Sequence, residues 1–206
     1  MGRPKLHDSQ TGEQLLDAAE RIVVRDGADA LSIRTVAAEC GVSSRAVYSV
    51  YGSKQALLAA LGNRTFIMLG ERVAAHPRTA DPAADIVSAA LECFRALMIS
   101  RPALYEIGFQ STGEDDAVRN AYMPAAAESF MELVGLFARL ADAAGLPGHE
   151  PREAAIQFSA LCEGLATLEL RERRHCSPVD EREWRERWRQ ATKALVAGFG
   201  IPQNGS

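Results

Sequence analysis

The sequence predicts an all-α fold of about nine helices, divided between a small N-terminal domain and a larger C-terminal one. Ala and Leu are abundant, alternation of β-branched residues is absent, and Pro and Gly stand at intervals that separate helices. The 206 residues, 47% hydrophobic and 24% charged, can bury a core without disulfide or metal staples. No apolar run approaches the roughly 18 residues of a membrane span and the N-terminus lacks a signal segment, so we expect a cytoplasmic protein without a membrane partner.

The helices of the N-terminal part are each predicted from a capping residue at the start and a Gly or Pro at the end. The residues that start them are Thr11 (in a capping box with Gln14), Ser32, Ser43 and Ser53. The residues that end them are Gly27, Gly41, Gly52 and Pro77. The first helix carries an apolar stripe from Leu15 to Val23, whereas residues 1–10 are expected to form a flexible basic arm.

Further helices are predicted beyond Pro77. Asp81-Pro82 is typical of an N-cap followed by the first helical position, and Ser177-Pro178 repeats this pattern before the last helix. Pro124 falls inside a long apolar-periodic segment, which we expect it to kink or split. The predicted ranges are 81–100, 102–109, 115–144, 151–174 and 177–199.

Charge is distributed unevenly along the chain. With 27 acidic residues against 23 Lys and Arg, the formal net charge is −4, which by itself argues against a nucleic-acid partner. Between Glu39 and Glu71, however, there is no acidic residue, and Arg45, Lys54 and Arg64 lie in that interval. Three cations in such an interval can also arise by chance on a solvent-exposed helix face. The residues around them therefore decide whether this segment is a binding surface.

Residues 32–51 are typical of a helix-turn-helix. Gly41 tolerates a positive φ in the turn, Val42 can fill the corner between the helices, and Ser43 can cap the second helix at once. A small core between the two helices is expected from Val36, Ala37 and Val47. The residues that the second helix presents outward are Ser44, Arg45, Tyr48 and Ser49. In this geometry an Arg can pair bidentately with guanine, while Ser and Tyr hydroxyls suit phosphates.

The segment from Thr11 to Leu57 resembles the N-terminal domain of TetR-family transcriptional regulators. The matching residues are Leu15, Leu16, Ala18, Ala19, Gly27, Ser32, Val36, Ala37, Gly41, Val42, Ser43, Tyr48, Gly52, Ser53, Lys54 and Leu57. The resemblance implies a dimeric repressor whose helix 43–51 enters the major groove, with Tyr48 and Lys54 on phosphates. The departures from the family's pattern are Gly12 (usually basic), Arg45 (usually small) and Val50-Tyr51 (usually His-Phe). The departures at Gly12 and at Val50-Tyr51 concern individual contacts with the DNA backbone. Arg45 suggests that the operator has a distinctive base at the position it contacts.

This resemblance divides the chain into an arm at 1–10, a DNA-binding domain at 11–57, a ligand-binding and dimerisation domain at 58–200 and a tail at 201–206. Beyond residue 70 it rests on the helix count and on residues 163–169, which are similar to a stretch of one TetR C-terminal subgroup. The partner it implies is double-stranded operator DNA. The residues expected to contact DNA are Arg3, Lys5, Ser32, Arg34, Thr35, Ser43, Ser44, Arg45, Ala46, Tyr48, Ser49, Tyr51 and Lys54. For Arg3 and Lys5 there are two interpretations, an arm that enters the minor groove and a frayed terminus.

The middle helices carry aromatic and Met side chains with few polar groups. This composition fits either core packing or a pocket for a small hydrophobic effector, and a kink at Pro124 would open space among these side chains. The candidate pocket residues are Phe66, Phe94, Met98, Tyr105, Phe109, Tyr122, Met123, Phe130, Phe137 and Cys162. The identity of the effector is not written in the sequence.

The last predicted helix carries a coiled-coil-like seam. Its members are Trp184, Trp188, Ala191 and Leu195. An intramolecular core would have the same spacing, but two tryptophans in a narrow stripe flanked by charges favour a dimer interface. The matching face one helix earlier would be Phe158, Leu161, Leu165 and Leu168. Because a TetR dimer pairs these two helices with their mates in a four-helix bundle, the resemblance implies a homodimer.

Other classes of function find little support in the residues. The cysteines contain no C-x-x-C pair, and Glu172-x-x-His175 lacks the second such pair of a di-iron bundle, so we expect no metal or cofactor. A helical enzyme would need a polar catalytic constellation, and no nucleophile elbow, P-loop or dinucleotide motif occurs. A constitutive architectural DNA binder would need a strongly basic surface, which the net charge of −4 opposes. The sequence therefore predicts a ligand-responsive, DNA-binding repressor.

Overall fold

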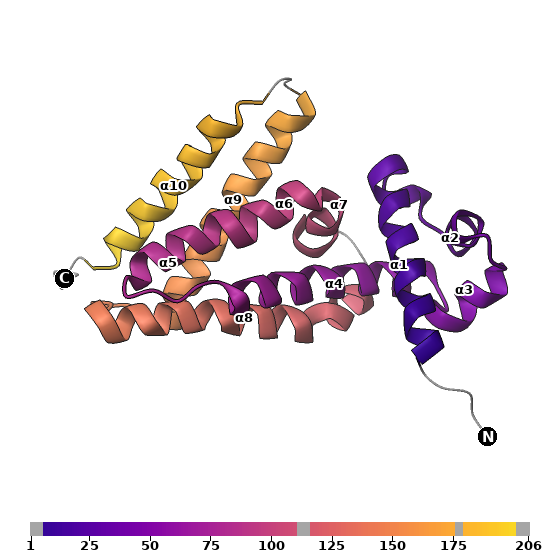
Figure 1. Ribbon diagram of the computed structural model, residues 1–206, viewed down its shortest axis with the longest axis horizontal. Helices are drawn as coiled ribbons and strands as arrows, with labels where there is room; N and C mark the ends of the chain where they lie inside the picture. The colour runs from indigo at the N-terminus through magenta and orange to yellow at the C-terminus, as the bar shows by residue number, and fades with distance from the viewer. Residues whose placement is uncertain (1–5, 111–115, 176–178, 201–206) are drawn as a thin grey trace. The chain divides into compact units, whose positions relative to one another are not determined.

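The structure, a computed structural model, describes residues 6–110, 116–175 and 179–200. Every regular element within these ranges is a helix, as Figure 1 shows. The predicted all-α fold is therefore confirmed, and each predicted helix has a counterpart in the described residues. Within the same ranges, no helix is both long enough and apolar enough to cross a membrane.

The first part of the chain contains short helices followed by one long helix. These are α1 (Leu6–Asp26), a 3-10 turn η1 (Ala28–Ala30), α2 (Ile33–Cys40), α3 (Ser44–Tyr51) and α4 (Lys54–Ala75). Ser53 caps α4 as predicted, because its Oγ accepts a hydrogen bond of 3.1 Å from the backbone N–H of Ala56.

The remaining helices include two π-helical segments. The run from Pro82 to Ser100 consists of α5 (Pro82–Ala89), the π-helical η2 (Ala90–Arg95) and α6 (Ala96–Ser100). A second run consists of α7 (Pro102–Tyr105) and the π-helical η3 (Glu106–Gln110). The last three helices are α8 (Asp116–Ala144), α9 (Pro151–His175) and α10 (Glu181–Gly198). Asp81 caps α5 as predicted, with its Oδ1 accepting from the N–H of Ala84 at 3.0 Å.

The first and the last helix begin at other residues than the sequence predicts. α1 begins at Leu6, so residues 6–10, expected to belong to a flexible arm, are helical. Neither Gly nor Pro lies between Pro4 and Thr11, so the helix can extend past the capping box at Thr11. α10 begins at Glu181, because Asp180 accepts a hydrogen bond of 3.0 Å from the N–H of Glu183; the expected start at Ser177 lies outside the described residues.

Of the two outcomes predicted for Pro124, a kink or a split, the split does not occur, since α8 runs through this residue without interruption. A proline inside a helix removes one backbone hydrogen bond and strains the preceding turn. Tyr122 and Ala125 are both buried nearby, and burial of these side chains offsets part of that cost.

The chain divides into two compact units. Unit 1 comprises Met1–Phe66 and Pro102–Pro124, and unit 2 comprises Ile67–Arg101 and Ala125–Ser206. α4 and α8 each contribute residues to both units.

In unit 1, α7 and η3 are attached to the first part of α4 by polar and aromatic contacts. Thr65 donates a hydrogen bond of 2.8 Å from its Oγ1 to the carbonyl of Leu104. The ring of Phe66 lies 4.9 Å from that of Phe109 and 5.7 Å from that of Tyr122. Because of these contacts, the compact unit does not end at the domain boundary predicted between residues 57 and 58.

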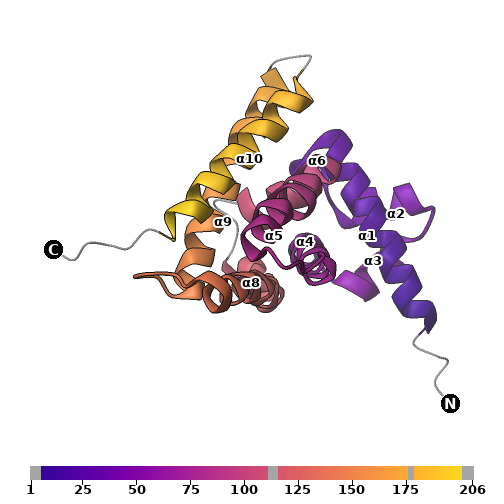
Figure 2. The same ribbon diagram turned by 60° about the vertical axis from the view of Figure 1, so that its left-hand side comes forward.

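The core of unit 1 lies between α1, α2, α3 and the start of α4, and Figures 1 and 2 show α2 and α3 beside α1. Its buried apolar residues include Leu15, Leu16, Ala18, Ala19, Ile22, Val23, Val36, Ala37, Val47, Leu57, Leu58 and Leu61. The predicted inward stripe of the first helix and the predicted small core of the helix-turn-helix are thereby confirmed.

In unit 2, α9 and α10 form an antiparallel pair (Figures 1 and 2). The aromatic core includes Phe158, whose ring lies 5.5 Å from that of Phe137 and 6.2 Å from that of Phe94. Phe137 in turn lies 5.8 Å from Phe199. These contacts join α8, α9, η2 and the end of α10 in one core.

Candidate nucleic-acid interface

The start of α2 is fixed by a reciprocal capping box. Ser32 accepts a hydrogen bond of 3.1 Å from the N–H of Thr35 through its Oγ, and the Thr35 hydroxyl accepts one of 2.9 Å from the N–H of Ser32. The same hydroxyl also lies 3.0 Å from the carbonyl of Ala30, to which it donates. Both hydroxyls, predicted to contact DNA, therefore already have partners within the chain.

The turn between α2 and α3 depends on Gly41. This residue has φ 65° and ψ 29°, in the left-handed region that a side chain disfavours. Val42 follows, and its N–H donates to the carbonyl of Ala37 at 3.0 Å. Ser43 then caps α3 by accepting a hydrogen bond of 3.2 Å from the N–H of Ala46. The predicted turn is confirmed, although Val42 is 40% exposed and does not fill the corner completely.

α3 is anchored by one face and open on the other. Val47 is fully buried, whereas Tyr48 is 64% exposed. The other outward-facing residues are Ser44, Arg45 and Ser49, all exposed as predicted, while Ala46 is half-buried. Among the described residues Arg45 makes no ion pair or side-chain hydrogen bond. Its guanidinium is therefore available to a partner outside the chain.

Two predicted DNA-contacting residues at the end of α3 and the start of α4 hold the domain together. The hydroxyl of Tyr51 donates a hydrogen bond of 2.8 Å to the carbonyl of Gly12 on α1, and burial raises the pKa of this hydroxyl. Lys54 donates from Nζ to the carbonyl of Asp29 over 3.3 Å. The contact of Tyr51 with α1 is a structural role that the sequence did not indicate.

The electrostatic character of the helix-turn-helix is positive. α2 and α3 together contain one acid, Glu39. Hydrogen bonds from Arg25 and Arg21, at 3.2 and 3.3 Å, lower the pKa of Glu39, so its charge is matched. Arg34 and Arg45 are exposed and have no carboxylate partner in the described ranges. Arg3 and Lys5, predicted to be part of the interface, lie outside these ranges.

The ten predicted pocket residues fall into two groups, one in each unit. In unit 1, Tyr105 stacks on Phe109 with their ring centroids 4.9 Å apart, and Phe109 contacts Phe66. Tyr122 belongs to the same cluster, whereas Met123 is 46% exposed. The members that belong to unit 2 are Phe94, Met98, Phe130, Phe137 and Cys162, all buried except the half-buried Phe130. A role for either group in ligand binding stays a prediction.

The predicted dimer seam contains residues that the single chain already buries. Phe158 and Trp188 have no exposed surface, and Trp188 donates from Nε1 to Glu169 at 2.8 Å. These two residues are core rather than interface, because a side chain without exposed surface cannot contact a second copy. Trp184 is also buried, with 5% exposed. The remaining predicted members keep exposed surface: Leu161, Leu165, Leu168, Ala191 and Leu195.

Sequence reasoning missed a buried ionic network in unit 2. Glu169 is fully buried and accepts hydrogen bonds from Nε and Nη2 of Arg95 at 3.0 and 2.7 Å. Arg173 donates to the same carboxylate at 2.5 Å, and Arg95 also reaches Glu181 at 2.8 Å. The network joins η2, α9 and α10, and the separation of 74 residues between Arg95 and Glu169 left no local pattern to find.

A short two-helix motif with a left-handed Gly in its turn, an exposed second helix and unpaired cations is the arrangement of helix-turn-helix DNA-binding proteins. The family model for bacterial regulatory proteins of the tetR family matches residues 15–61 of the sequence. The model of the tetracyclin repressor-like C-terminal domain matches residues 87–195, more than half of the chain. The chain belongs to the TetR family.

Similar proteins include the HTH-type nicotine-responsive transcriptional repressor HdnoR of Paenarthrobacter nicotinovorans, which is 34% identical over 103 residues, or 47% of this chain. The match spans about half of that relative, 52% of its length. A structure of a protein with unknown function from Rhodococcus sp. RHA1 has a TM-score of 0.78 at 21% identity, covering 97% of this chain and 100% of that one. FadR from Bacillus subtilis, in complex with stearoyl-CoA, has a TM-score of 0.75 at 15% identity, covering 92% and 99%. The two structures show the same fold.

Proposed function

We propose that the protein is a homodimeric transcriptional repressor that binds an operator through α3 and releases it when a small apolar effector binds. The observation that carries the proposal is the outward face of α3, where Tyr48 and Arg45 are exposed and Arg45 has no carboxylate partner among the described residues. The similarity to a nicotine-responsive transcriptional repressor supports it.

Operator reading is assigned to the first turns of α3 and to the start of α4. Arg45 is in the first turn of α3, whose residues meet base edges in helix-turn-helix complexes, and its guanidinium can donate to both O6 and N7 of a guanine. Tyr48 and Lys54 contact phosphates. The 3.3 Å hydrogen bond from Lys54 to a backbone carbonyl is long, and a charged phosphate oxygen is a stronger acceptor.

Dimerisation is assigned to a groove between α9 and α10, with a volume of about 750 Å³. Its lining residues are Leu165, Leu168, Arg171, Glu172, His175, Trp184, Arg187, Gln190 and Ala191. The Nε1 of Trp184 is buried here and has no hydrogen-bond partner among the described residues. Leu168 is 53% exposed in the same groove, and packing against a second copy would remove this apolar side chain from water.

A dimer is also required by the DNA. Two recognition helices reach successive major grooves when they lie roughly 34–36 Å apart, and each chain contains one such helix in its described residues.

Release by an effector is assigned to the apolar aromatic clusters and to α4. This helix begins at Lys54, directly after α3 and Gly52-Ser53, and continues without a break from unit 1 into unit 2. A ligand can act through it only if it prefers one arrangement of the dimer. A coupling free energy of about 1–3 kcal/mol would lower operator affinity roughly 5–150-fold.

The test is a fluorescence anisotropy titration of the full chain with DNA from upstream of its own gene, repeated with a panel of small aromatic and aliphatic compounds. The proposal predicts a complex that resists competitor DNA and that at least one compound dissociates. Met98→Trp, which enlarges a fully buried side chain of the unit 2 cluster, should weaken release and leave operator affinity unchanged.

Two results would overturn the proposal. Binding that shows no preference over random DNA would identify a non-specific DNA-binding protein. A panel in which compounds bind tightly but none changes operator affinity would remove effector-gated repression, because linkage requires the two affinities to change by the same factor.

A further inference from the structure

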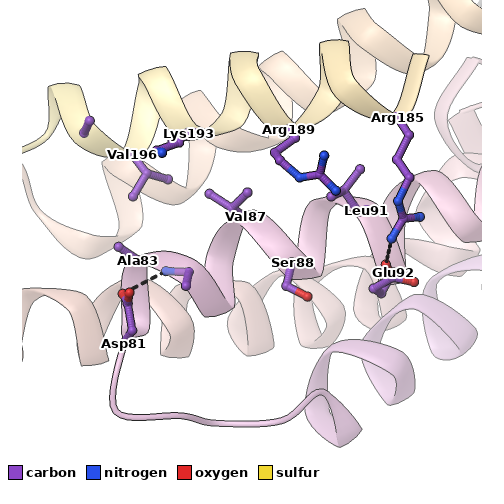
Figure 3. Close-up of a pocket in the computed structure, with 12 residues that line it drawn as sticks. Asp81, Ala83, Val87, Ser88, Leu91, Glu92, Arg185, Arg189, Lys193 and Val196 are labelled. Atoms are coloured by element: carbon purple, nitrogen blue, oxygen red, sulfur yellow. Dashed lines mark hydrogen bonds and ion pairs between the residues drawn. The ribbon is translucent and has the colours of Figure 1, made fainter. Parts of the chain in front are cut away.

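Unit 2 contains a second groove, which none of the assignments above uses. It lies between α10 and the run formed by α5 and η2, and Figure 3 shows its lining. Its volume of about 510 Å³ falls within the range of roughly 300–1,000 Å³ that is usual for small-molecule sites. The lining residues are Asp81, Ala83, Ala84, Val87, Ser88, Leu91, Glu92, Arg185, Arg189, Lys193, Val196 and Ala197.

The floor of this groove is apolar. Val87 and Leu91 point from α5 and η2 toward α10, where Val196 lies across from them (Figure 3). Ala83 and Ala197 carry only a methyl group, which leaves space between the helices. An apolar body lying on this floor would be removed from water, which favours binding by roughly 25 cal/mol for each Å² buried.

The acids of the lining are both engaged near the ends of the groove. Asp81 accepts the capping hydrogen bond of 3.0 Å from the N–H of Ala84, and Glu92 forms an ion pair with Arg185 (Figure 3). The negative charge of Glu92 is therefore matched by Arg185, whereas the carboxylate of Asp81 is stabilised by the N-terminus of α5.

The α10 wall of the groove carries positive charge. Arg189 and Lys193 follow Arg185 at steps of four residues, so that the three side chains share one face of α10. Arg189 pairs with Glu186, a surface residue that does not line the groove. Lys193 makes no ion pair or side-chain hydrogen bond with any described residue. An anionic group in the groove would find an unpaired cation in Lys193 and a solvent-exposed one in Arg189.

The walls of the groove are held in place before any ligand binds. Arg95 of η2 donates to Glu181 of α10 at 2.8 Å and to the buried Glu169 of α9 at 2.7 Å. These hydrogen bonds fix α10 beside η2 at the end of the groove where Arg185 and Glu92 meet. A preformed site loses less conformational entropy on binding than one that must be ordered.

We propose that this groove binds a small organic carboxylate with an extended apolar body, whose chain lies on Val87 and Leu91 and whose carboxylate meets Lys193 and Arg189. It is a ligand site separate from the effector clusters, because no predicted effector residue belongs to its lining.

The test compares three probes that share an eight-carbon chain: octanoate, octanol and octylamine. Isothermal titration calorimetry at low ionic strength should show one octanoate bound per chain, with the neutral alcohol and the cationic amine binding at least about tenfold more weakly. Equal binding of octanoate and octanol would contradict the role of the cations.

Variants of the exposed cations locate the site. Lys193→Gln and Arg189→Gln should each weaken octanoate binding roughly fivefold, since both charges are solvent-exposed. Arg182→Gln, which removes an exposed cation of the same helix outside the groove, should leave the affinity unchanged. Met98→Trp should also leave it unchanged, which separates this site from the proposed effector cluster.

A blocking variant tests the apolar floor. Val87→Trp should abolish octanoate binding by filling the groove, with circular dichroism as the check on folding. If that variant unfolds, Ala84→Trp at the exposed rim supplies the same test. Octanoate binding that survives both the double variant K193Q/R189Q and the Trp variant would overturn the proposal.

Discussion

Two arginines, one in each unit, use their charge in opposite ways. In unit 1, Arg45 stands exposed on α3 without a carboxylate partner among the described residues. In unit 2, Arg95 is 5% exposed and holds the fully buried Glu169 with two hydrogen bonds. Exposed, unpaired charge is free to meet a polyanion, whereas buried, paired charge fixes helices against one another. Exposure and ion pairing, rather than the sign of the charge, therefore distinguish an arginine that can bind a partner from one that holds helices together.

The buried network has a clear centre. Glu169 accepts hydrogen bonds from Arg95, Arg173 and Trp188, so one carboxylate joins side chains of three helical segments. Such a pair contributes less net stability than its attraction suggests, because both charges are desolvated, but losing one partner leaves a charge buried alone.

The largest expected effect comes from breaking this network. Glu169→Gln should lower the free energy of unfolding by about 3 kcal/mol, because it removes the buried counter-charge of Arg95 and leaves the largely exposed Glu181 as its remaining ion-pair partner. Urea denaturation followed by circular dichroism measures the loss. Glu186→Gln, which removes a surface ion pair with Arg189, is the matched control and should cost less than about 1 kcal/mol. Equal losses in the two variants would show that burial does not distinguish these charges.

The next effect concerns assembly. Leu168 is 53% exposed and lines the groove between α9 and α10, so Leu168→Glu should weaken the dimer by about 2 kcal/mol and produce monomers at micromolar concentration. Sedimentation velocity measures the oligomeric state. Ile156→Glu changes another exposed apolar residue of α9 outside that groove and should leave the dimer intact. If Leu168→Glu stays dimeric, the dimer interface lies elsewhere on the chain.

The exposed charge of unit 1 should affect binding and not stability. Arg45→Ala is expected to cost about 1–3 kcal/mol of operator binding and to relax the preference at one base position, with an unchanged urea midpoint. Lys54→Ala is the comparison variant, because a phosphate contact should weaken all sequences alike and reduce the salt slope by about one unit. If both variants reduced affinity uniformly, Arg45 would be a backbone contact.

The smallest effect is a pH dependence within the network. Hydrogen bonds from Arg95 and Arg173 lower the pKa of Glu181 below its ordinary value of 4.5. Because the folded-state pKa is lowered, this contribution to stability is present above about pH 4.5 and is lost as the pH falls through the folded-state pKa. Glu181→Gln should therefore remove part of the acid dependence of the unfolding free energy, by less than about 1 kcal/mol, since the carboxylate is largely exposed. An unaltered slope between pH 3 and 5 would contradict this.

Local chemistry made the helix-turn-helix predictable from the sequence. Ser32 and Ser43 cap their helices and Gly41 takes the left-handed conformation, because each of these effects operates within a few residues. Tyr51 was a different case, since its hydroxyl bonds to the carbonyl of Gly12, 39 residues away, and nothing nearby in the sequence marks that contact.

The orientation of α10 could not be predicted for the same reason. A seam with helical spacing looks identical whether it faces a second copy or the interior of its own chain. Trp188 faces inward, where its indole N–H meets Glu169, 19 residues earlier, and the charge of that buried carboxylate is matched by Arg95 and Arg173.

The central claim is that the exposed face of α3 reads one half of a two-fold operator. The most direct measurement is repeated selection of binding sites from random duplex DNA, carried out with the wild-type protein and with Arg45→Ala. We expect an inverted repeat whose half-sites are centred roughly 34–36 Å apart along the duplex, or a multiple of that distance, with one guanine in each half lost from the consensus of the variant. Selection of no inverted repeat, or an identical consensus for both proteins, would contradict it.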